Sequence, residues 1–146
     1  MTHKPLTNAD EALVDAARRV VSENYEHGRH YVGAAVRTAS GEIYAAVHIE
    51  ANVGRASVCA EPIALGKAVS DGATDIEAIA SVRHPGPGEG DEIPVVSPCG
   101  VCRELISDLD EDITVIYDHD GDVTKTRAVD LLPGKYVKSY RKAHLE

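Results

Sequence analysis

The sequence predicts an α/β protein: a three-layer α/β/α sandwich with a mixed five-stranded sheet. Helical segments and short strands rich in valine, isoleucine and alanine alternate through the middle of the chain, which favours helices packed on a sheet. Two early strands joined by a tight turn form an antiparallel pair, whereas strands separated by helices favour parallel pairing. With 146 residues, of which 43% are apolar, we expect one domain, residues 1–146, with a sizeable core.

The first half of the chain predicts a helix, a hairpin and a second helix. Thr7 and Asp10 resemble a capping box with Asp in place of Glu, so a helix opens at Thr7 and ends before Gly28. Residues 31–36 and 43–49 predict two strands joined by a turn. After a loop, the next helix begins at about Cys59 and stops at Gly72, with a proline tolerated in its first turn.

The second half predicts three more strands and one helix. Residues 76–82 predict a strand, and the following loop, residues 83–93, holds three glycines and two prolines. A helix follows Pro98 and runs through Leu109. The remaining strands are expected at 113–117 and 123–129, with a turn at 118–122 between them.

The cysteines of the chain fall in two short stretches. Cys59 begins a C-A-E run, and Cys99 and Cys102 form a P-C-x-x-C run about forty residues later. Zinc prefers tetrahedral thiolate and imidazole ligands, and a catalytic zinc keeps one position open, so three cysteines fit an open zinc site. Glu61 then lies beside the metal as a proton carrier. A structural zinc site, unrelated thiols and a redox-active C-x-x-C are the alternatives, but the paired pattern is more specific.

Both cysteine stretches are expected at helix N-termini. Three thiolates on Zn²⁺ give a net negative centre that would acidify a bound water poorly. The positive ends of two helix dipoles, together with N–H donors to the sulfurs, offset that charge. The predicted helix positions therefore support a catalytic role for the metal.

Composition and charge restrict the partners. A formal net charge of −9 argues against a nucleic-acid polyanion and favours a small neutral or cationic substrate, although solubility or a salt-adapted host would also explain it. The polar N-terminus and the lack of a long apolar run predict neither a signal peptide nor a membrane span. Thiolate ligands need reducing conditions, so we expect the cytoplasm.

Four stretches carry a resemblance to a known family. They are V-G-A-A at 32–35, C-A-E at 59–61, P-C-G-V-C-R at 98–103 and L-L-P at 131–133. With them, most of the chain resembles the cytidine deaminase superfamily, in which zinc activates water and a glutamate moves protons. Further stretches resemble the branch that deaminates blasticidin S, in its bacterial form: 46–51, 54–55, 82–85 and 102–108. The resemblance implies the fold, the zinc, a homotetramer and hydrolytic loss of ammonia from a cytosine ring.

The resemblance assigns roles to residues near the metal. Glu61 would protonate the ring nitrogen and the leaving amine, whereas the alternative is an ordinary acid at a helix N-terminus. Arg103 would donate to the thiolates or to a neighbouring subunit, and a surface arginine is the alternative. The arginine that commonly follows C-A-E in cytidine deaminases is Pro62 here.

Four further residues are candidates for substrate binding. The N-x-E pattern that contacts the sugar in cytidine deaminases reads His48-Ile49-Glu50 here, and His30 stands where a phenylalanine is common. Glu50 would bind a hydroxyl or a cationic amine, His48 and His30 would line the pocket, and Tyr136 would close it, either within its own subunit or from a neighbouring one. The alternatives are a surface carboxylate, structural histidines and a packing tyrosine.

These observations support one hypothesis over three others. The favoured function is a zinc-dependent aminohydrolase that acts on the cytosine of a small nucleoside, with blasticidin S or a related nucleoside antibiotic preferred. The alternative within enzymes is deamination of cytidine or deoxycytidine. A non-catalytic zinc-stabilised binding domain would have no need for Glu61, and the negative charge disfavours a base within a nucleic acid.

Overall fold

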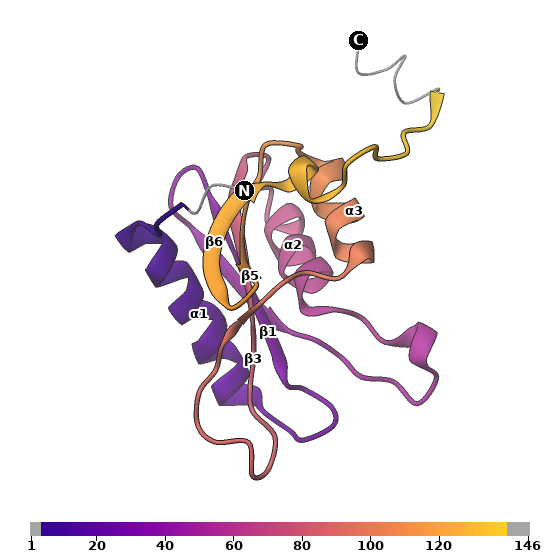
Figure 1. The fold of residues 1–146 in the computed structure, drawn as a ribbon. Coiled ribbons are helices and arrows are strands. Elements are labelled where there is room, and N and C mark those ends of the chain that lie inside the picture. The colour runs from indigo at the N-terminus through magenta and orange to yellow at the C-terminus, as the bar shows by residue number, and fades with distance from the viewer. Residues whose placement is uncertain (1–3, 140–146) are drawn as a thin grey trace.

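The computed structural model describes residues 4–139, which form a mixed six-stranded sheet with helices on its two faces (Figure 1). The helices are α1 (Asn8–Asn24), α2 (Ala60–Ser70) and α3 (Gly100–Leu109). The strands are β1 (Val32–Thr38), β2 (Ile43–Val47), β3 (Ile76–Arg83), β4 (Val95–Val96), β5 (Thr114–His119) and β6 (Asp122–Arg127). Short 3₁₀ turns occupy Gly54–Ala56 and Ala128–Leu131. The strand order is β2-β1-β3-β5-β6, with β4 also paired to β3.

Local sequence signals place the element ends well. The capping box of α1 is confirmed, because the Thr7 hydroxyl accepts from the Asp10 N–H at 3.1 Å and the Asp10 carboxylate accepts from the Thr7 N–H at 3.0 Å. The β5–β6 turn is also where the sequence predicts it. Asp120 and Gly121 both have positive φ, at 51° and 92°, as a two-residue hairpin turn requires.

The expectation of five strands is wrong, since the sheet has a sixth, β4. Val95 and Val96 pair antiparallel with Val82 and Ser81 of β3. Two residues are too few to produce an alternating pattern, so a prediction from periodicity misses them. β5 pairs with residues 78–80 of β3, directly before the two β3 residues that pair with β4. β4 and β5 therefore lie one after the other along the same edge of β3. The position of β4 fixes the backbone directly before the second cysteine stretch.

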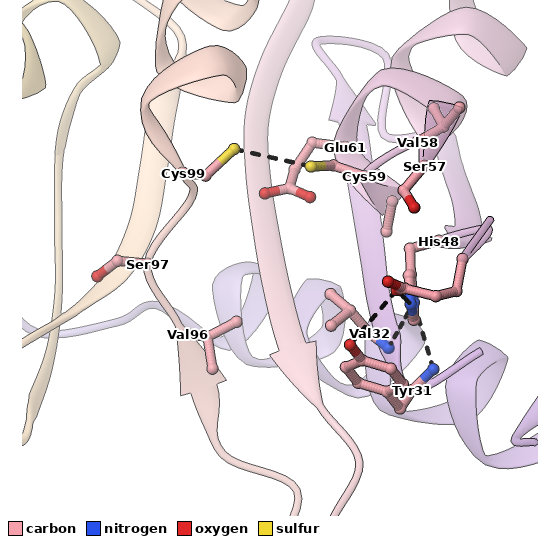
Figure 2. Close-up of a pocket in the computed structure, with 12 residues that line it drawn as sticks. Tyr31, Val32, His48, Ser57, Val58, Cys59, Glu61, Val96, Ser97 and Cys99 are labelled. Carbon is pink, nitrogen blue, oxygen red and sulfur yellow. Dashed lines mark hydrogen bonds and ion pairs between the residues drawn. The ribbon is translucent and has the colours of Figure 1, made fainter. Parts of the chain in front are cut away.

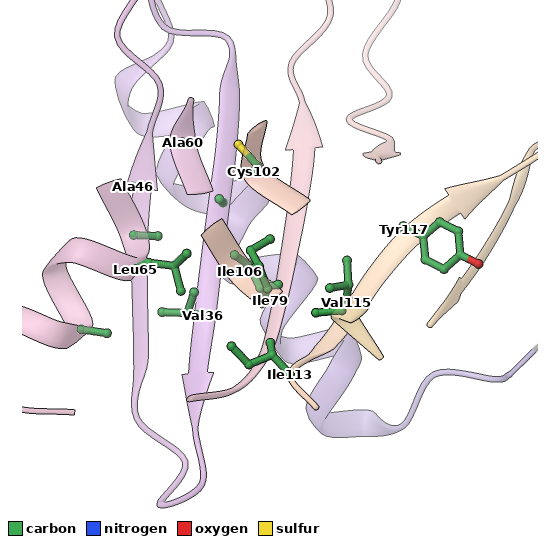
Figure 3. Close-up of a cluster of buried hydrophobic side chains, with 14 of the residues drawn as sticks. Val36, Ala46, Ala60, Leu65, Ile79, Cys102, Ile106, Ile113, Val115 and Tyr117 are labelled. Atoms are coloured by element: carbon green, nitrogen blue, oxygen red, sulfur yellow. The ribbon is translucent and has the colours of Figure 1, made fainter. Parts of the chain in front are cut away.

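The sheet has an apolar core on each face, which confirms the three layers. Ala34 and Val36 of β1 belong to the cluster that packs against α2 and α3, part of which is drawn in Figure 3, whereas Ala35 belongs to the cluster with α1. This alternation is the two-residue period of a strand. Gly33 allows α1 to approach closely, because a Cβ there would lie 2.5 Å from the Ala17 carbonyl oxygen. Within residues 4–139, no helix is long and apolar enough to cross a membrane.

Candidate active site

The two cysteine stretches meet at the N-termini of α2 and α3. Cys59 and Cys99 are the N-cap residues of these helices, both with extended backbone, and neither uses its sulfur to cap its helix. Cys102 lies in the first turn of α3 and is fully buried. The Sγ of Cys99 lies 3.7 Å from that of Cys59 and 3.5 Å from that of Cys102. Figure 2 shows Cys59 and Cys99 pointing toward one another from the two helices.

The sulfur geometry fits a zinc ion. All three Sγ atoms lie within 4.8 Å of one another, whereas a disulfide would bring two of them to about 2 Å. Sulfurs bound to zinc at about 2.3 Å in a tetrahedron lie about 3.8 Å apart, close to the two separations given above. Burial raises the pKa of the Cys102 thiol, and the neighbouring Glu61 carboxylate raises it further. A bound cation would therefore allow the three thiols to ionise together.

The surrounding backbone favours negative charge at the sulfurs. The N-terminal ends of α2 and α3 carry the positive ends of their helix dipoles, as expected from the sequence. Burial acts to raise the pKa of the Cys99 thiol, but a hydrogen bond from the backbone N–H of Cys102 helps to hold it below the usual value. The guanidinium of Arg103 donates to two carbonyl oxygens of described residues, those of Pro98 at 2.9 Å and Leu131 at 3.4 Å. Arg103 therefore fixes the backbone before Cys99.

Glu61 is a buried acid next to the sulfur cluster. It is the second residue of α2 and is only 5% exposed. Burial raises the pKa of its carboxyl, and hydrogen bonds from its own backbone N–H and from the Ser81 hydroxyl offset this effect only in part. A carboxyl in this environment takes up a proton more readily than one on the surface. Its position beside Cys59 is visible in Figure 2.

A cleft of about 280 Å³ opens in front of the sulfurs and Glu61. Its wall combines apolar side chains with a few polar groups, as is typical of small-molecule sites. The lining residues are Tyr31, Val32, His48, Glu50, Ser57, Val58, Cys59, Ala60, Glu61, Val96, Ser97 and Cys99. The structure thus brings Cys59, Cys99 and Glu61 together with His48 and Glu50 in the wall of one cleft.

His48 uses both ring nitrogens within the protein. Its Nδ1 accepts from the backbone N–H groups of Tyr31 at 3.3 Å and Val32 at 3.1 Å, so the ring proton resides on Nε2. Nε2 then donates to Oε2 of Glu50 at 3.1 Å, and the Tyr31 hydroxyl donates to the same oxygen at 3.4 Å. His48 therefore orients Glu50, which is the acidic group at this part of the cleft wall.

Two of the expected substrate-binding residues lie elsewhere in the described structure. The Nδ1–H of His30 donates to the carbonyl oxygen of His48 at 2.9 Å, so His30 supports the strand segment behind the cleft and is not one of the lining residues. Tyr136 is 76% exposed and also lies outside the lining set. Tyr31 and Ser97 do line the cleft and were not expected. The signal that could have found them is adjacency, since Tyr31 directly precedes the V-G-A-A run and Ser97 directly precedes the P-C-G-V-C-R run.

Comparisons with known proteins agree with this geometry. The family described as "Cytidine and deoxycytidylate deaminase zinc-binding region" matches residues 7–117. The chain is 49% identical over 135 residues to the blasticidin-S deaminase of Bacillus cereus, covering 92% of this chain and 96% of the relative. It is 33% identical to a cytidine deaminase of Sporosarcina psychrophila, with coverage of 88% and 91%. The crystal structure of cytidine deaminase from Burkholderia pseudomallei superposes with a TM-score of 0.70 at 30% identity, covering 90% of this chain and all of that one.

Proposed function

The chain belongs to the cytidine and deoxycytidylate deaminase family, and from this premise we propose a substrate, a mechanism and an assembly for it. It is a zinc-dependent hydrolytic deaminase of cytosine-type substrates. The observation that carries the proposal is the placement of a buried carboxyl, Glu61, beside three convergent thiols at one end of a cleft. A non-catalytic zinc-binding domain would not need that carboxyl, so we infer catalysis by the single domain of residues 1–146.

The proposed roles follow from the chemistry of the site residues. Cys59, Cys99 and Cys102 hold zinc, which supplies Lewis-acid activation of the water that attacks C4 of the ring. Glu61 accepts a proton from this water and passes it to the ring nitrogen, and it then passes the proton of the new C4 hydroxyl to the amine, which leaves as ammonia. The raised pKa of Glu61 suits a group that must both accept and release protons. The net reaction consumes one water, replaces the C4 amine by a keto oxygen and releases ammonia.

The proposed substrate is blasticidin S or a related nucleoside antibiotic. Support comes from the 49% identity to the Bacillus cereus blasticidin-S deaminase and from His48, which holds Glu50 as an oriented acceptor for a hydroxyl or cationic amine. The alternative substrate is cytidine or deoxycytidine. Its support is the 33% identity to the Sporosarcina cytidine deaminase, which is lower than the identity to the blasticidin-S deaminase. The cleft of about 280 Å³ suits a small nucleoside. A nucleic acid is disfavoured as substrate because the chain has a net charge of −9, which would repel its phosphates.

Ammonia release distinguishes these substrates. The purified zinc-loaded protein is assayed with blasticidin S, cytidine and deoxycytidine, and kcat/KM is compared. We expect kcat/KM for blasticidin S to exceed the others by about tenfold or more, the discrimination of roughly one good polar contact. Equal or higher values for cytidine would assign the chain to pyrimidine salvage, and no ammonia from any of the three would refute the proposed function.

We also propose a homotetramer with metal sites near its interfaces. Val101, Leu105 and Leu109 lie four residues apart along α3, and their exposed fractions are 74%, 37% and 46%. Such an exposed apolar stripe is typical of an interaction surface, and Cys99 of the metal site is the N-cap of the same helix. In a tetramer, Tyr136 would reach the cleft of a neighbouring subunit. The free thiols of the metal site require a reducing compartment, for which we propose the cytoplasm.

The mass in solution tests the assembly. Light scattering on the zinc-loaded protein should give four times the chain mass of 15.6 kDa, and Leu109→Glu should lower it by placing a charge in the stripe. The matched control is Val69→Glu on α2, which is 49% exposed and lies outside the stripe. A parent protein with the mass of one chain would contradict the tetramer.

A further inference from the structure

A second cleft, of about 320 Å³, adjoins the first and shares the side chain of Tyr31 with it. Its lining residues are Tyr25, His27, Gly28, Tyr31, Arg83, His84 and Gly86. The backbone N–H of His84 donates to the carbonyl oxygen of Tyr31 at 2.7 Å, which fixes the end of β3 against this residue. Tyr31 therefore separates two hollows, with its hydroxyl at Glu50 of the first cleft and its ring beside Arg83 of the second.

The chemistry of the second cleft is opposite to that of the first. Glu50 and Glu61 line the first cleft, whereas the lining of the second, as far as the structure describes the chain, includes no aspartate or glutamate. Its charged lining group is the Arg83 guanidinium, whose Cζ lies 5.8 Å from the centroid of the Tyr31 ring. In a chain with a net charge of −9, this cleft is suited to an anion that shares Arg83 with Glu89 or displaces it, because Glu89 pairs with Arg83 from outside the lining.

Arg83 retains capacity for a ligand. Its Nη1 donates to Glu89 at 2.9 Å, and the two side chains are 43% and 51% exposed, so this is a surface ion pair of small energy. A guanidinium carries five N–H donors in a planar fork, and one bond to Glu89 leaves others for a second acceptor. The ring of His84 stacks on Tyr25 with centroids 3.8 Å apart, which holds the cleft wall next to Arg83 in place.

We propose that the second cleft binds a carboxylate attached to the sugar of the cytosine nucleoside, with Arg83 as its partner. This inference rests on the proposed function, since cytosine must occupy the first cleft for its sugar to lie near Tyr31. Both a carboxylate and a phosphate pair bidentately with a guanidinium, but a carboxylate carries one negative charge and a phosphate monoester close to two, so the carboxylate is favoured here. The carboxylate of Glu89 and the net charge of the chain oppose a dianion. The V-R-H-P run at 82–85 thereby gains a role in substrate selection.

The experiment compares cytidine with its derivative oxidised to a carboxylate at C5′, and with cytidine 5′-monophosphate. The measured quantity is the ratio of kcat/KM for the carboxylate to kcat/KM for cytidine, in the parent protein and in Arg83→Gln. We expect this ratio to fall about 10- to 100-fold in Arg83→Gln, which corresponds to the loss of one hydrogen-bonded charge pair. Glu89→Gln should raise the ratio, because it removes the competing carboxylate.

Arg19→Gln is the matched control, since it removes the same charge from the exposed face of α1 and should leave the ratio unchanged. A ratio that is equal in the parent protein and in Arg83→Gln, or an Arg83-dependent preference for the phosphate, would overturn the inference. Calorimetric binding of uridine and uridine 5′-carboxylate supplies a readout without turnover. Tighter Arg83-dependent binding of the carboxylate without ammonia release would refute the proposed function alone, whereas deamination without Arg83-dependent discrimination would refute the second cleft alone.

Discussion

Two buried acids, Asp10 and Glu61, occupy similar local positions and have opposite properties. Each lies in the first turn of a helix, α1 or α2, and each is almost fully buried, with exposed fractions of 1% and 5%. The helix dipole alone would lower the pKa of both carboxyls. Instead, the pKa of Asp10 is lowered to about 2 and that of Glu61 is raised.

The difference comes from the cations that reach Asp10. Burial alone would raise the pKa of its carboxyl, but hydrogen bonds from Lys125 and Thr7 outweigh this effect. The Lys125 ammonium donates at 2.6 Å, and two N–H groups of Arg37 donate at 3.2 Å each. Because Arg37 lies on β1 and Lys125 on β6, the Asp10 carboxylate joins α1 to two strands that are not neighbours in the sheet.

Glu61 has different neighbours. Besides its own N–H, its hydrogen-bond partners are the Ser81 hydroxyl and the Cys102 thiol, and His48 makes a smaller contribution that lowers the pKa of the carboxyl. A buried carboxyl without a paired cation is costly as an anion and therefore accepts a proton readily. A buried carboxyl that is paired with cations is thus a fixed structural carboxylate, whereas a buried carboxyl without a paired cation is suited to proton transfer.

The largest expected effect is on catalysis by Glu61→Gln. The amide cannot accept a proton from water or return one to the leaving amine, so ammonia release should fall by about 10² to 10⁴ or more. Glu61 is not proposed as a ligand, so zinc content should stay at one per chain and thermal stability should hold. The measurement combines metal analysis, thermal unfolding and ammonia release on one preparation.

Cys99→Ala is the matched control for this prediction. It removes a proposed ligand, so it should lose zinc, activity and stability together, because bound metal contributes folding free energy. Activity in Glu61→Gln within a few-fold of the parent would rule out the proton carrier. Loss of zinc in Glu61→Gln would mean that Glu61 is a ligand or a structural residue, and the comparison with Asp10 would then fail.

The sequence predicts the positions of Asp10 and Glu61 in their helices, but it does not predict which of the two acids is paired with cations. The capping box of Asp10 and the helix that begins after Cys59 depend on residues within one turn, so both are predictable from the sequence. The partners of Asp10 are not, because they lie 27 and 115 residues away along the chain. A local pattern therefore cannot tell which of two similar acids will be paired with cations.

The same limit applies within the site. The ligand spacing and Glu61 follow from short motifs, whereas the hydrogen bonds from Tyr31 and Val32 that turn His48 toward Glu50 depend on the exact register of the β1–β2 hairpin. The two-residue strand β4 and the contacts of Arg103 with carbonyl oxygens also depend on tertiary packing. The second cleft falls in the same class, since its walls come from residues 25–31 and 83–86.

The second-largest expected effect is the loss of folding stability in the variant Asp10→Ala. Asp10→Ala leaves Arg37 and Lys125 without their shared carboxylate, so the free energy of unfolding should fall by about 3 to 5 kcal/mol. Urea unfolding at fixed protein concentration measures it. Asp15→Ala on the same helix is the control, because Asp15 pairs with Arg18 at the surface and its loss should cost less than about 1 kcal/mol. Equal losses for the two variants would show that Asp10 is not a structural anchor.

The smallest expected effect is the acid dependence of that anchor. The pKa of Asp10 is lowered from 3.8 to about 2, so its stabilisation is complete above pH 4 and is lost as the pH falls through 2. This shift corresponds to about 2 kcal/mol. The neutral Asp10→Asn variant lacks this titration, and other acids and the thiol ligands titrate in both proteins. The difference in free energy of unfolding between the parent and Asp10→Asn should therefore shrink by about 2 kcal/mol between pH 5 and pH 2. A difference that stays constant over this range would mean that Asp10 keeps an ordinary pKa, and the proposed effect of its cations on the carboxyl would then fail.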